Sequence, residues 1–268
     1  MRQGSFSIIT VHYNAPADLA RLLRSLEGDE AVAAEQVVVV DNGSDDQDRV
    51  RGLLDDYPWV RAVYNQNNLG LARAANQALR LTSGEFVVHL NPDIVVLPGA
   101  LARMRELLLR HQDIGLVFAK LTDATGQLQY SCRRFYDLRT VLCRRTGWAG
   151  RLWPEVESNH LMADWDHNTM REIDWAQGAA FMARRAALPQ GRLFDERFFL
   201  YFEDVDLCLA MHRNNWGVVY LPEATMIHAH QRASYGRGIN RATWEHLKSL
   251  IKFSMKYHGL SVAEKSRT

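Results

Sequence analysis

Cysteine is scarce in this chain, which has only Cys132, Cys143 and Cys208 among its 268 residues. An odd and sparse set does not build a disulfide framework, so we expect a reducing, cytoplasmic compartment. Apolar runs that approach ~20 residues are also lacking, so we expect no transmembrane helix. The stretch MRQGSFSIITVHYN lacks the apolar segment of a signal peptide, so we expect none.

An excess of charge of either sign is absent as well. Lys and Arg number 32 against 31 Asp and Glu, which gives a formal net charge of +1 at pH 7. No global field therefore favours nucleic acid or another polyanion as a partner. With 47% hydrophobic and 24% charged residues, the composition is that of a globular protein with a large core, in one large domain or two small ones.

What is present is a regular alternation of strand and helix patterns over residues 6–112. Short apolar, β-branched runs predict strands, and apolar residues at helical spacing predict the helices between them. The predicted strands are 6–13, 37–40, 60–66 and 85–90, and the predicted helices are 17–28, 45–57, 68–84 and 97–112. This pattern favours an α/β fold with a mostly parallel sheet and right-handed crossovers.

The second half of the chain is less regular. Residues 120–170 hold few clean periods, and residues 173–186 predict a strand with a glycine break. We expect a helix from about Glu203, a pair of strands over 217–230, and a basic, aromatic amphipathic helix over 241–258.

Polar clusters follow three of the predicted strands. They are His12-Tyr13-Asn14, Asp41-Asn42-Gly43-Ser44 and Asn91-Pro92-Asp93. One such cluster is ordinary turn chemistry, but ligands of open parallel sheets bind beyond the carboxyl ends of the strands. Three clusters at one edge therefore favour a binding site.

Two common ways of binding a diphosphate are excluded by the residues at these turns. The turn after the first strand is His-Tyr-Asn-Ala-Pro, without the glycines of a dinucleotide fingerprint, and there is no P-loop sequence. A divalent cation that bridges phosphate oxygens to a carboxylate remains, and Asp93 is placed for that role.

At this point the chain resembles a family 2 glycosyltransferase of the GT-A type over nearly its whole length. The resemblance rests on the stretches TVHYN, VVVVDNGSDD, NNLGLARAANQAL, GEFVVHLNPD, DWAQGAAFM, FDERFFLYFEDVDLCLAM and MIHAHQRAS. The elements SCRRF, PEVESNHLMADWDH and FFLYFEDVDL are similar to bacterial rhamnosyltransferases. The implied fold is one continuous, Rossmann-like GT-A domain. Residues 1–115 would form its donor half, 116–240 its acceptor and catalytic half, and 241–268 a C-terminal helix and tail.

The resemblance implies a donor site and a metal site. Asp41 would contact the nucleobase or ribose of the nucleotide sugar, and Asp93 and His228 would bind Mn²⁺ or Mg²⁺ at its diphosphate. The family often has Asp-x-Asp where this chain has Asn91-Pro92-Asp93, so one carboxylate ligand is missing. His230 and Ser234 are further candidates for diphosphate contact. The other implied donor residues are Thr10, Tyr13, Asn42, Asn68, Arg73, Asn76, Asn91 and Arg232.

The resemblance also implies catalytic residues. Transfer to a hydroxyl needs a general base, and the family's Glu-Asp motif assigns that role to Asp204. Glu203 would bind the acceptor or orient Asp204, whereas Asp206 is expected to be structural. A base instead of a nucleophile predicts direct displacement with inversion at the anomeric carbon.

Two other classes of protein remain compatible with this sequence. A nucleotidyltransferase would use a similar sheet and a metal, but it would need a glycine-rich basic loop after the first strand, which this chain lacks. A nucleotide-sugar-binding module without activity would be expected to lack Asp93, Asp204 or His228, and all three are present.

The identities of the substrates are expectations at the level of resemblance. The donor would be dTDP-rhamnose, and the acceptor a glycan or a polyprenyl-diphosphate-linked sugar in cell-envelope polysaccharide assembly. Residues 241–258 offer aromatic side chains together with Lys248, Lys252 and Lys256, which recur every four residues. This pattern suggests either contact with a membrane surface, on the cytoplasmic face, or packing on the sheet.

Overall fold

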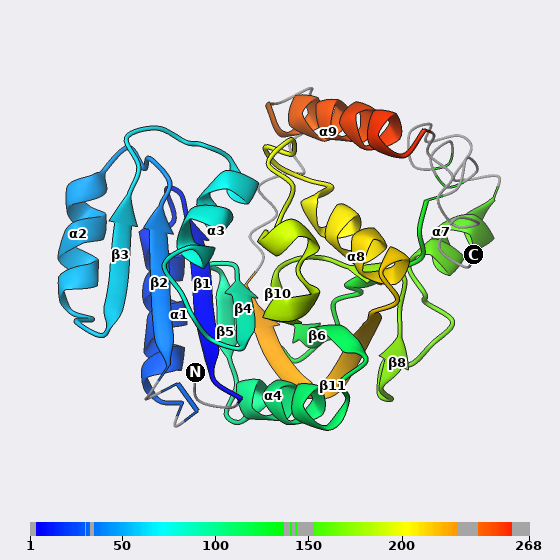
Figure 1. Ribbon diagram of the computed structural model, residues 1–268, viewed down its shortest axis with the longest axis horizontal. Helices are drawn as coiled ribbons and strands as arrows, with labels where there is room; N and C mark the ends of the chain where they lie inside the picture. The colour runs from blue at the N-terminus through cyan, green and yellow to red at the C-terminus, as the bar shows by residue number, and fades with distance from the viewer. Residues whose placement is uncertain are drawn as a thin grey trace.

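The computed structural model describes residues 4–29, 31–32, 35–136, 140, 143, 153–229 and 241–258. Within these residues, nine strands form one sheet that runs through the centre of the molecule (Figure 1). Its order is β3 (Val60–Tyr64), β2 (Gln36–Asp41), β1 (Phe6–His12), β4 (Phe86–Leu90), β10 (Ala180–Arg184), β6 (Ile114–Thr122), β11 (Gly217–His228) and β5 (Ile94–Val96), with β8 (Arg171–Glu172) paired to β11.

The predicted α/β fold with a mostly parallel sheet is confirmed. Strands β3, β2, β1, β4, β6 and β11 run in one direction, whereas β10, β5 and β8 run in the other. The prediction of a strand pair over 217–230 is wrong. Residues 217–228 form the single strand β11, whose register against β6 shifts between Leu221 and Thr225, beside Pro222. Because proline cannot donate a ladder hydrogen bond, it produces an irregularity that resembles a turn in the sequence.

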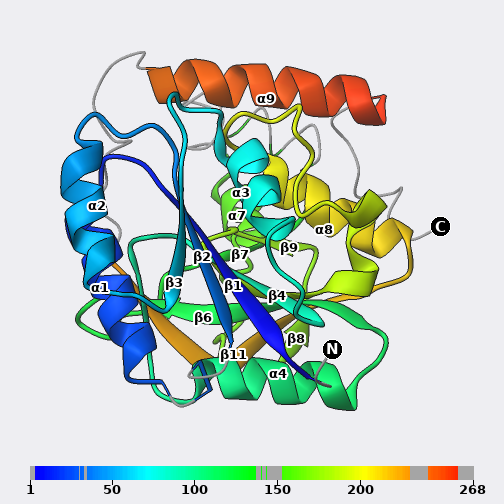
Figure 2. The ribbon, with the colours of Figure 1, turned by 60° about the vertical axis from the view of Figure 1, so that its left-hand side comes forward.

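Helices cover both faces of the sheet. On one face, α1 (Pro16–Glu27) and α4 (Ala100–Arg110) bury their leucines against β1, β4 and β6, and α2 (Gln47–Asp55) packs beside α1. On the other face lie α3 (Leu71–Leu79), whose buried alanines allow a close approach to the sheet, and α8 (Glu203–Arg213). The long helix α9 (Arg241–Tyr257) lies outside α8 on this second face (Figures 1 and 2).

The less regular part of the chain completes the second face. It contains a small sheet of β7 (Cys132–Arg133) and β9 (Trp175–Ala176), the helix α7 (Pro154–His160), and two 3₁₀ turns, Arg185–Ala187 and Pro189–Gly191. Each of the three cysteines is buried as a free thiol. This part of the chain packs on the same apolar cluster as α3 and α8.

Candidate active site

Asp93 and His228, the predicted metal ligands, lie side by side at the carboxyl edge of the sheet. Strand β5 follows Asp93 directly and pairs antiparallel with the end of β11, so that Ile94 lies opposite His228. The Ala229 amide also donates to the Asp93 carbonyl at 2.8 Å. As a result, His228 Nε2 lies 3.2 Å from Asp93 Oδ2. The sequence prediction that these two residues share a site agrees with this geometry.

Gln129, which sequence reasoning missed, holds His228 by both ends of its amide. Gln129 Oε1 lies 2.8 Å from His228 Nδ1, and Gln129 Nε2 donates to the His228 carbonyl at 2.9 Å. Because the oxygen can only accept, the proton of a neutral His228 ring must be on Nδ1. The lone pair of Nε2 then points toward the Asp93 carboxylate.

This arrangement fits a divalent cation. The Nε2 atom of a neutral His228 ring and a carboxylate oxygen of Asp93 can both bind one cation, and metal-bound histidines commonly donate their other ring nitrogen to an acceptor. Adjacent ligands at ~2.1 Å from an octahedral metal are about 3 Å apart, close to the observed separation. Within the described residues, no group of three or more His, Cys, Asp and Glu side chains could hold a metal. The described residues thus offer two neighbouring candidate ligands, Asp93 and His228.

Asp204, the predicted base, lies in the first turn of helix α8 and is held at a fixed orientation. Its Oδ2 accepts from the Gly178 amide at 3.1 Å, and its Oδ1 accepts from the Val205 amide at 2.8 Å. Burial raises the pKa of Asp204, while the amide hydrogen bonds and the positive charge of Arg133 oppose that rise. A raised pKa makes a carboxylate a better acceptor for the proton of a hydroxyl.

Glu203 is the more deeply buried carboxyl of the pair. Burial, with the neighbouring charge of Asp204 as a smaller cause, raises the pKa of Glu203 to about 8. Its Oε2 has no hydrogen-bond partner in the described part of the chain. Burial therefore favours the protonated form of Glu203, and the neighbouring Asp204 carboxylate adds to this effect.

The turn before these carboxyls is strained. Tyr201 and Phe202 have φ angles of 68° and 70°, a left-handed conformation that costs a bulky residue roughly 1–3 kcal/mol. The Phe199 carbonyl accepts from the Leu71 amide at 2.8 Å, and a Cβ on Gly70 would lie 2.7 Å from that carbonyl oxygen. The start of α3 therefore packs against the strained turn and restricts its position.

Gly178 and Ala179 lie between the Asp93–His228 pair and Asp204. The Gly178 amide donates to Asp204, and the next carbonyl, that of Ala179, accepts from the Asn91 amide at 2.8 Å. Asn91 opens the turn that carries Asp93. The two carboxylates with different predicted roles thus lie on either side of one short segment.

His89 supports this segment from inside the core. It lies 3.0 Å from the Gly178 carbonyl through Nδ1 and stacks on Phe181. Burial lowers the pKa of His89 to about 4. The ring is therefore neutral, and its Nδ1–H donates to the carbonyl beneath the site.

Asp41, the predicted contact of the nucleobase or ribose, is buried at the end of β2. Its side chain is fully buried and accepts from Ser44 Oγ and, at 2.8 Å, from Gln47 Nε2, while His12 Nδ1 lies 2.8 Å away. The Ala15 amide donates to His12 Nε2 at 3.0 Å, so the His12 proton lies on Nδ1 and is donated to Asp41. The oxygens of Asp41 thus have hydrogen-bond partners within the protein, and a contact of Asp41 with the nucleobase or ribose stays a prediction.

Asn42 organises the loop between β3 and α3. Its Nδ2 donates to Asn68 Oδ1 at 3.1 Å, and its Oδ1 accepts from Asn65 Nδ2 and the Leu69 amide, both at 3.1 Å. Asn68 Oδ1 also accepts from the Gly70 amide at 2.9 Å. Asn42 is buried and shapes this edge of the site, whereas Asn68 is half-exposed.

Asn76, another predicted donor residue, is also buried. Its Nδ2 donates to the Phe194 carbonyl at 2.8 Å and to Glu196 at 3.1 Å, and its Oδ1 accepts from the amides of Leu193 and Phe194. Each donor and acceptor position of the Asn76 amide forms a hydrogen bond with residues 193–196. These bonds join α3 to that segment. On the same helix, Arg73 is exposed, with its Nε 3.9 Å from Glu196.

The remaining predicted donor residues differ in exposure. Tyr13 is exposed and Asn91 is half-buried, whereas Thr10 is buried, with an Oγ1 that has no partner among the described residues. Arg232, His230 and Ser234 lie outside the described residues. Tyr13, Asn68, Arg73 and Asn91 therefore remain accessible at this edge.

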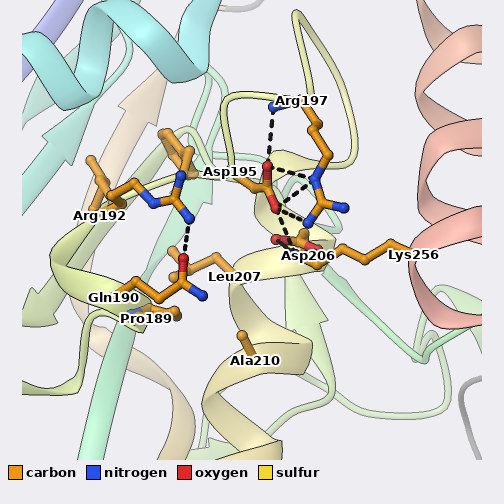
Figure 3. Close-up of a pocket in the computed structure, with 11 residues that line it drawn as sticks. Pro189, Gln190, Arg192, Asp195, Arg197, Asp206, Leu207, Ala210 and Lys256 are labelled. Carbon is orange, nitrogen blue, oxygen red and sulfur yellow. Dashed lines mark hydrogen bonds and ion pairs between the residues drawn. The ribbon is translucent and has the colours of Figure 1, made fainter.

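Helix α9 is fixed to the catalytic half by a buried ion-pair network (Figure 3). Lys256 Nζ lies 2.6 Å from Asp206 and 2.8 Å from Asp195, and Tyr257 donates to Asp206 at 2.7 Å. A cavity of about 100 Å³ lies beside this network. Asp206 is thus structural, as expected. Lys256 is paired within this contact, whereas Lys248 and Lys252, the other two lysines of the expected pattern, are exposed.

The fold and these carboxylates define a GT-A glycosyltransferase. The chain belongs to glycosyl transferase family 2, whose model matches residues 7–159. It is 29% identical over 266 residues to the N-acetylglucosaminyl-diphospho-decaprenol L-rhamnosyltransferase of Mycobacterium tuberculosis, covering 94% of this chain and 84% of that protein. It is 22% identical over 264 residues to rhamnosyltransferase WbbL of Escherichia coli, covering 95% and 94% of the two chains.

Solved structures share the fold at lower identity. The mannosyltransferase PcManGT of Pyrobaculum calidifontis, in complex with GDP-Man and Mn²⁺, has a TM-score of 0.61 and 19% identity over 93% of this chain. This chain spans 64% of that protein. Residues 1–349 of TarS of S. aureus have a TM-score of 0.62 and 16% identity, covering 98% of this chain and 68% of that chain. Among the described residues, no helix has the length and apolar character needed to cross a membrane.

Proposed function

We propose that this protein is an inverting, metal-dependent glycosyltransferase. It transfers a deoxyhexose, L-rhamnose, from a nucleoside-diphosphate sugar to a hydroxyl of a lipid-linked glycan in cell-envelope polysaccharide assembly. The observation that carries the proposal is the position of Asp204 and of the Asp93–His228 pair on either side of Gly178–Ala179. The names of the two rhamnosyltransferases support the choice of sugar, and that of the mycobacterial protein supports a diphosphate-linked acceptor.

The reaction follows from the roles of these residues. Asp204 takes the proton of the acceptor hydroxyl, whose oxygen attacks the anomeric carbon as the bond to the donor diphosphate breaks. Displacement from the opposite side inverts that carbon. A divalent ion bound by Asp93 and His228 would stabilise the negative charge on the leaving diphosphate. Burial favours the protonated form of Glu203, which would lessen the repulsion between the two adjacent carboxyls.

The division of labour along the chain is part of the same proposal. Residues 1–115 bind the donor through accessible groups that include Tyr13, Asn68 and Arg73. Residues 116–240 supply Gln129, Asp204 and His228, and they face the acceptor. One continuous sheet contains strands from both parts, which supports a single domain with two functional halves.

A binding experiment tests the donor and metal parts of the proposal. Purified protein is screened by thermal shift against nucleotide sugars, including dTDP-rhamnose, with and without Mn²⁺. At 100 times its Kd, a ligand stabilises the folded state by about 2.7 kcal/mol. We expect the strongest stabilisation with dTDP-rhamnose and Mn²⁺ together.

Two variants locate the metal site within the same assay. Asp93→Ala and His228→Ala should each remove the Mn²⁺-dependent part of the stabilisation, whereas the exposed control Asp166→Ala should keep it. A wild-type Mn²⁺ response in both site variants would place the metal elsewhere. Binding of donor without transfer to any acceptor would instead favour a binding module without activity.

A further inference from the structure

Helix α9 has a second apolar face that is exposed within the described part of the chain. Its inner face is buried by Leu250, Phe253 and Tyr257, which join the main apolar cluster. On the outer face, Trp244 is 54% exposed, Ile251 is 52% exposed and Met255 is 72% exposed. Single exposed apolar residues are ordinary, but these three are not scattered.

The three side chains form one row. Trp244, Ile251 and Met255 are spaced by seven and four residues, so they project from the same side of the helix. We call this row the outer stripe. A helix with apolar residues on two opposite sides has one side more than its packing on the core requires.

Positive charge flanks the outer stripe. Lys248 and Lys252 are both exposed, although Lys248 also pairs with Glu245 at 2.9 Å and Lys252 donates to the Arg197 carbonyl at 2.7 Å. The third lysine of the sequence pattern, Lys256, is partly buried, and its charge is paired with Asp206. An apolar row with lysines beside it matches the chemistry of anionic lipid headgroups above acyl chains.

The same helix contacts the catalytic turn directly. Ser249 donates to the Leu200 carbonyl at 2.8 Å, and the His246 ring lies 5.3 Å from the rings of Tyr201 and Phe202. Together with the Lys256–Asp206 ion pair, these contacts fix α9 relative to Glu203 and Asp204. Figure 2 shows α9 as a straight rod along the outside of the molecule.

We propose that the outer stripe of α9 docks on an anionic lipid bilayer and thereby positions the active site beside a lipid-linked acceptor. This inference rests on the proposed function for the acceptor, but the docking itself does not. A second copy of the chain is disfavoured by area. Three half-exposed side chains offer roughly 300 Å², whereas a stable dimer needs about 800 Å² per partner.

Vesicle sedimentation tests the docking. Wild-type protein and Trp244→Ser/Ile251→Ser/Met255→Ser are mixed with phosphatidylglycerol–phosphatidylcholine vesicles. The matched control, Trp59→Ser/Leu109→Ser/Met170→Ser, changes three exposed apolar residues elsewhere on the surface. We expect wild type and control to sediment with the vesicles and the outer-stripe variant to bind at least tenfold more weakly. Equal binding of all three proteins, or binding of none, overturns the proposal.

The charge contribution needs a separate variant. Lys248→Glu/Lys252→Glu leaves Lys256 in its ion pair, so the helix stays anchored. Binding of wild type should weaken at high salt, because screening removes attraction between exposed charges. The double variant should bind weakly at every salt concentration. Strong, salt-independent binding of both proteins would contradict the choice of anionic lipid.

Two further measurements distinguish membrane docking from dimer formation and from the proposed transfer activity. Analytical ultracentrifugation without vesicles that shows a dimer for wild type and a monomer for the outer-stripe variant would assign the stripe to a second copy and overturn the proposal. Transfer to a short, soluble acceptor should be unchanged in the outer-stripe variant and reduced only for acceptor in vesicles. Vesicle binding by a protein that transfers no sugar would refute the proposed function but not the docking.

Discussion

His228 and Gln129 form a two-point contact at the edge of the sheet. Gln129 Oε1 lies 2.8 Å from the ring Nδ1, and Gln129 Nε2 donates to the backbone carbonyl of the same histidine at 2.9 Å. The second bond fixes which end of the amide faces the ring. Gln129 therefore decides which nitrogen of His228 is available toward Asp93.

The first prediction concerns this contact. Gln129→Leu should weaken Mn²⁺ binding in the presence of a nucleoside diphosphate by about 10- to 100-fold, the usual effect of losing a partner of a metal-binding histidine. Gln129→Glu keeps an acceptor for Nδ1 and should lose much less. The measurement is Mn²⁺ titration followed by electron paramagnetic resonance, with the exposed neighbour Gln127→Leu as control. A lower melting temperature with unchanged Mn²⁺ affinity would mean that Gln129 only supports the fold.

The second prediction concerns Asp204. Asp204→Asn should bind donor and metal as wild type does but lose transfer, because an amide cannot accept the proton of the acceptor hydroxyl. A general base contributes roughly 10²–10⁴-fold to turnover. Donor affinity and single-turnover transfer are measured on the same preparation. Retention of more than about a tenth of wild-type turnover would argue against a base at this position.

The alternation of strands and helices in residues 6–112 could be predicted because its signals are local. The leucines of α1 at 19, 22, 23 and 26 are buried as their spacing predicts. The antiparallel orientation of β10 could not be predicted from its sequence, because the apolar run 180–184 is compatible with either a parallel or an antiparallel strand. Yet that antiparallel pairing, Ala180 against Leu90, brings Gly178 beside the metal turn.

The sequence predicted which candidate residues lie near each other where the chain resembles a known family. It did not predict which of them are buried. Asp93 and His228 were predicted together and lie together. Asp41 and Asn76 are polar residues in matching motifs, but the sequence does not show that other parts of the chain already use their hydrogen-bonding positions. Gln129 lies next to an isolated β-bridge between Thr122 and Leu128. The sequence around it has no strand or helix periodicity, so its position could not be predicted.

The third prediction concerns the space beside Asp204. A Cβ on Gly178 would lie 3.1 Å from Asp204 Cβ, which is closer than such atoms normally approach. Gly178→Ala should therefore displace the base by a few tenths of an ångström and reduce turnover roughly tenfold, since catalysis is sensitive to such displacements. Donor and Mn²⁺ binding should be unchanged. Gly52→Ala, in a helix with open space around it, is the matched control and should keep full activity. Equal turnover in both variants would show that the position of Asp204 tolerates the shift.

The last prediction follows from the raised pKa of Glu203. Burial raises it to about 8 in the folded protein, from an ordinary value of 4.5. Between these values, the folded state retains a proton that the unfolded state has released. The free energy of unfolding should therefore fall as the pH rises through this window, by up to about 1.4 kcal/mol per pH unit.

His89 acts in the opposite direction at lower pH. Its pKa of about 4 in the folded protein, against 6.5 ordinarily, means that the unfolded state binds more protons between those values, so stability rises with pH there. Above pH 6.5 the contribution of His89 is complete, and the decline due to Glu203 can be measured without it. Urea unfolding at pH 6.5 and pH 8 should show that Glu203→Gln, which cannot ionise, removes most of the decline. The exposed control Glu172→Gln should keep it. An equal decline in Glu203→Gln and wild type would mean that Glu203 is already ionised at neutral pH, and Asp204 would then have a charged neighbour.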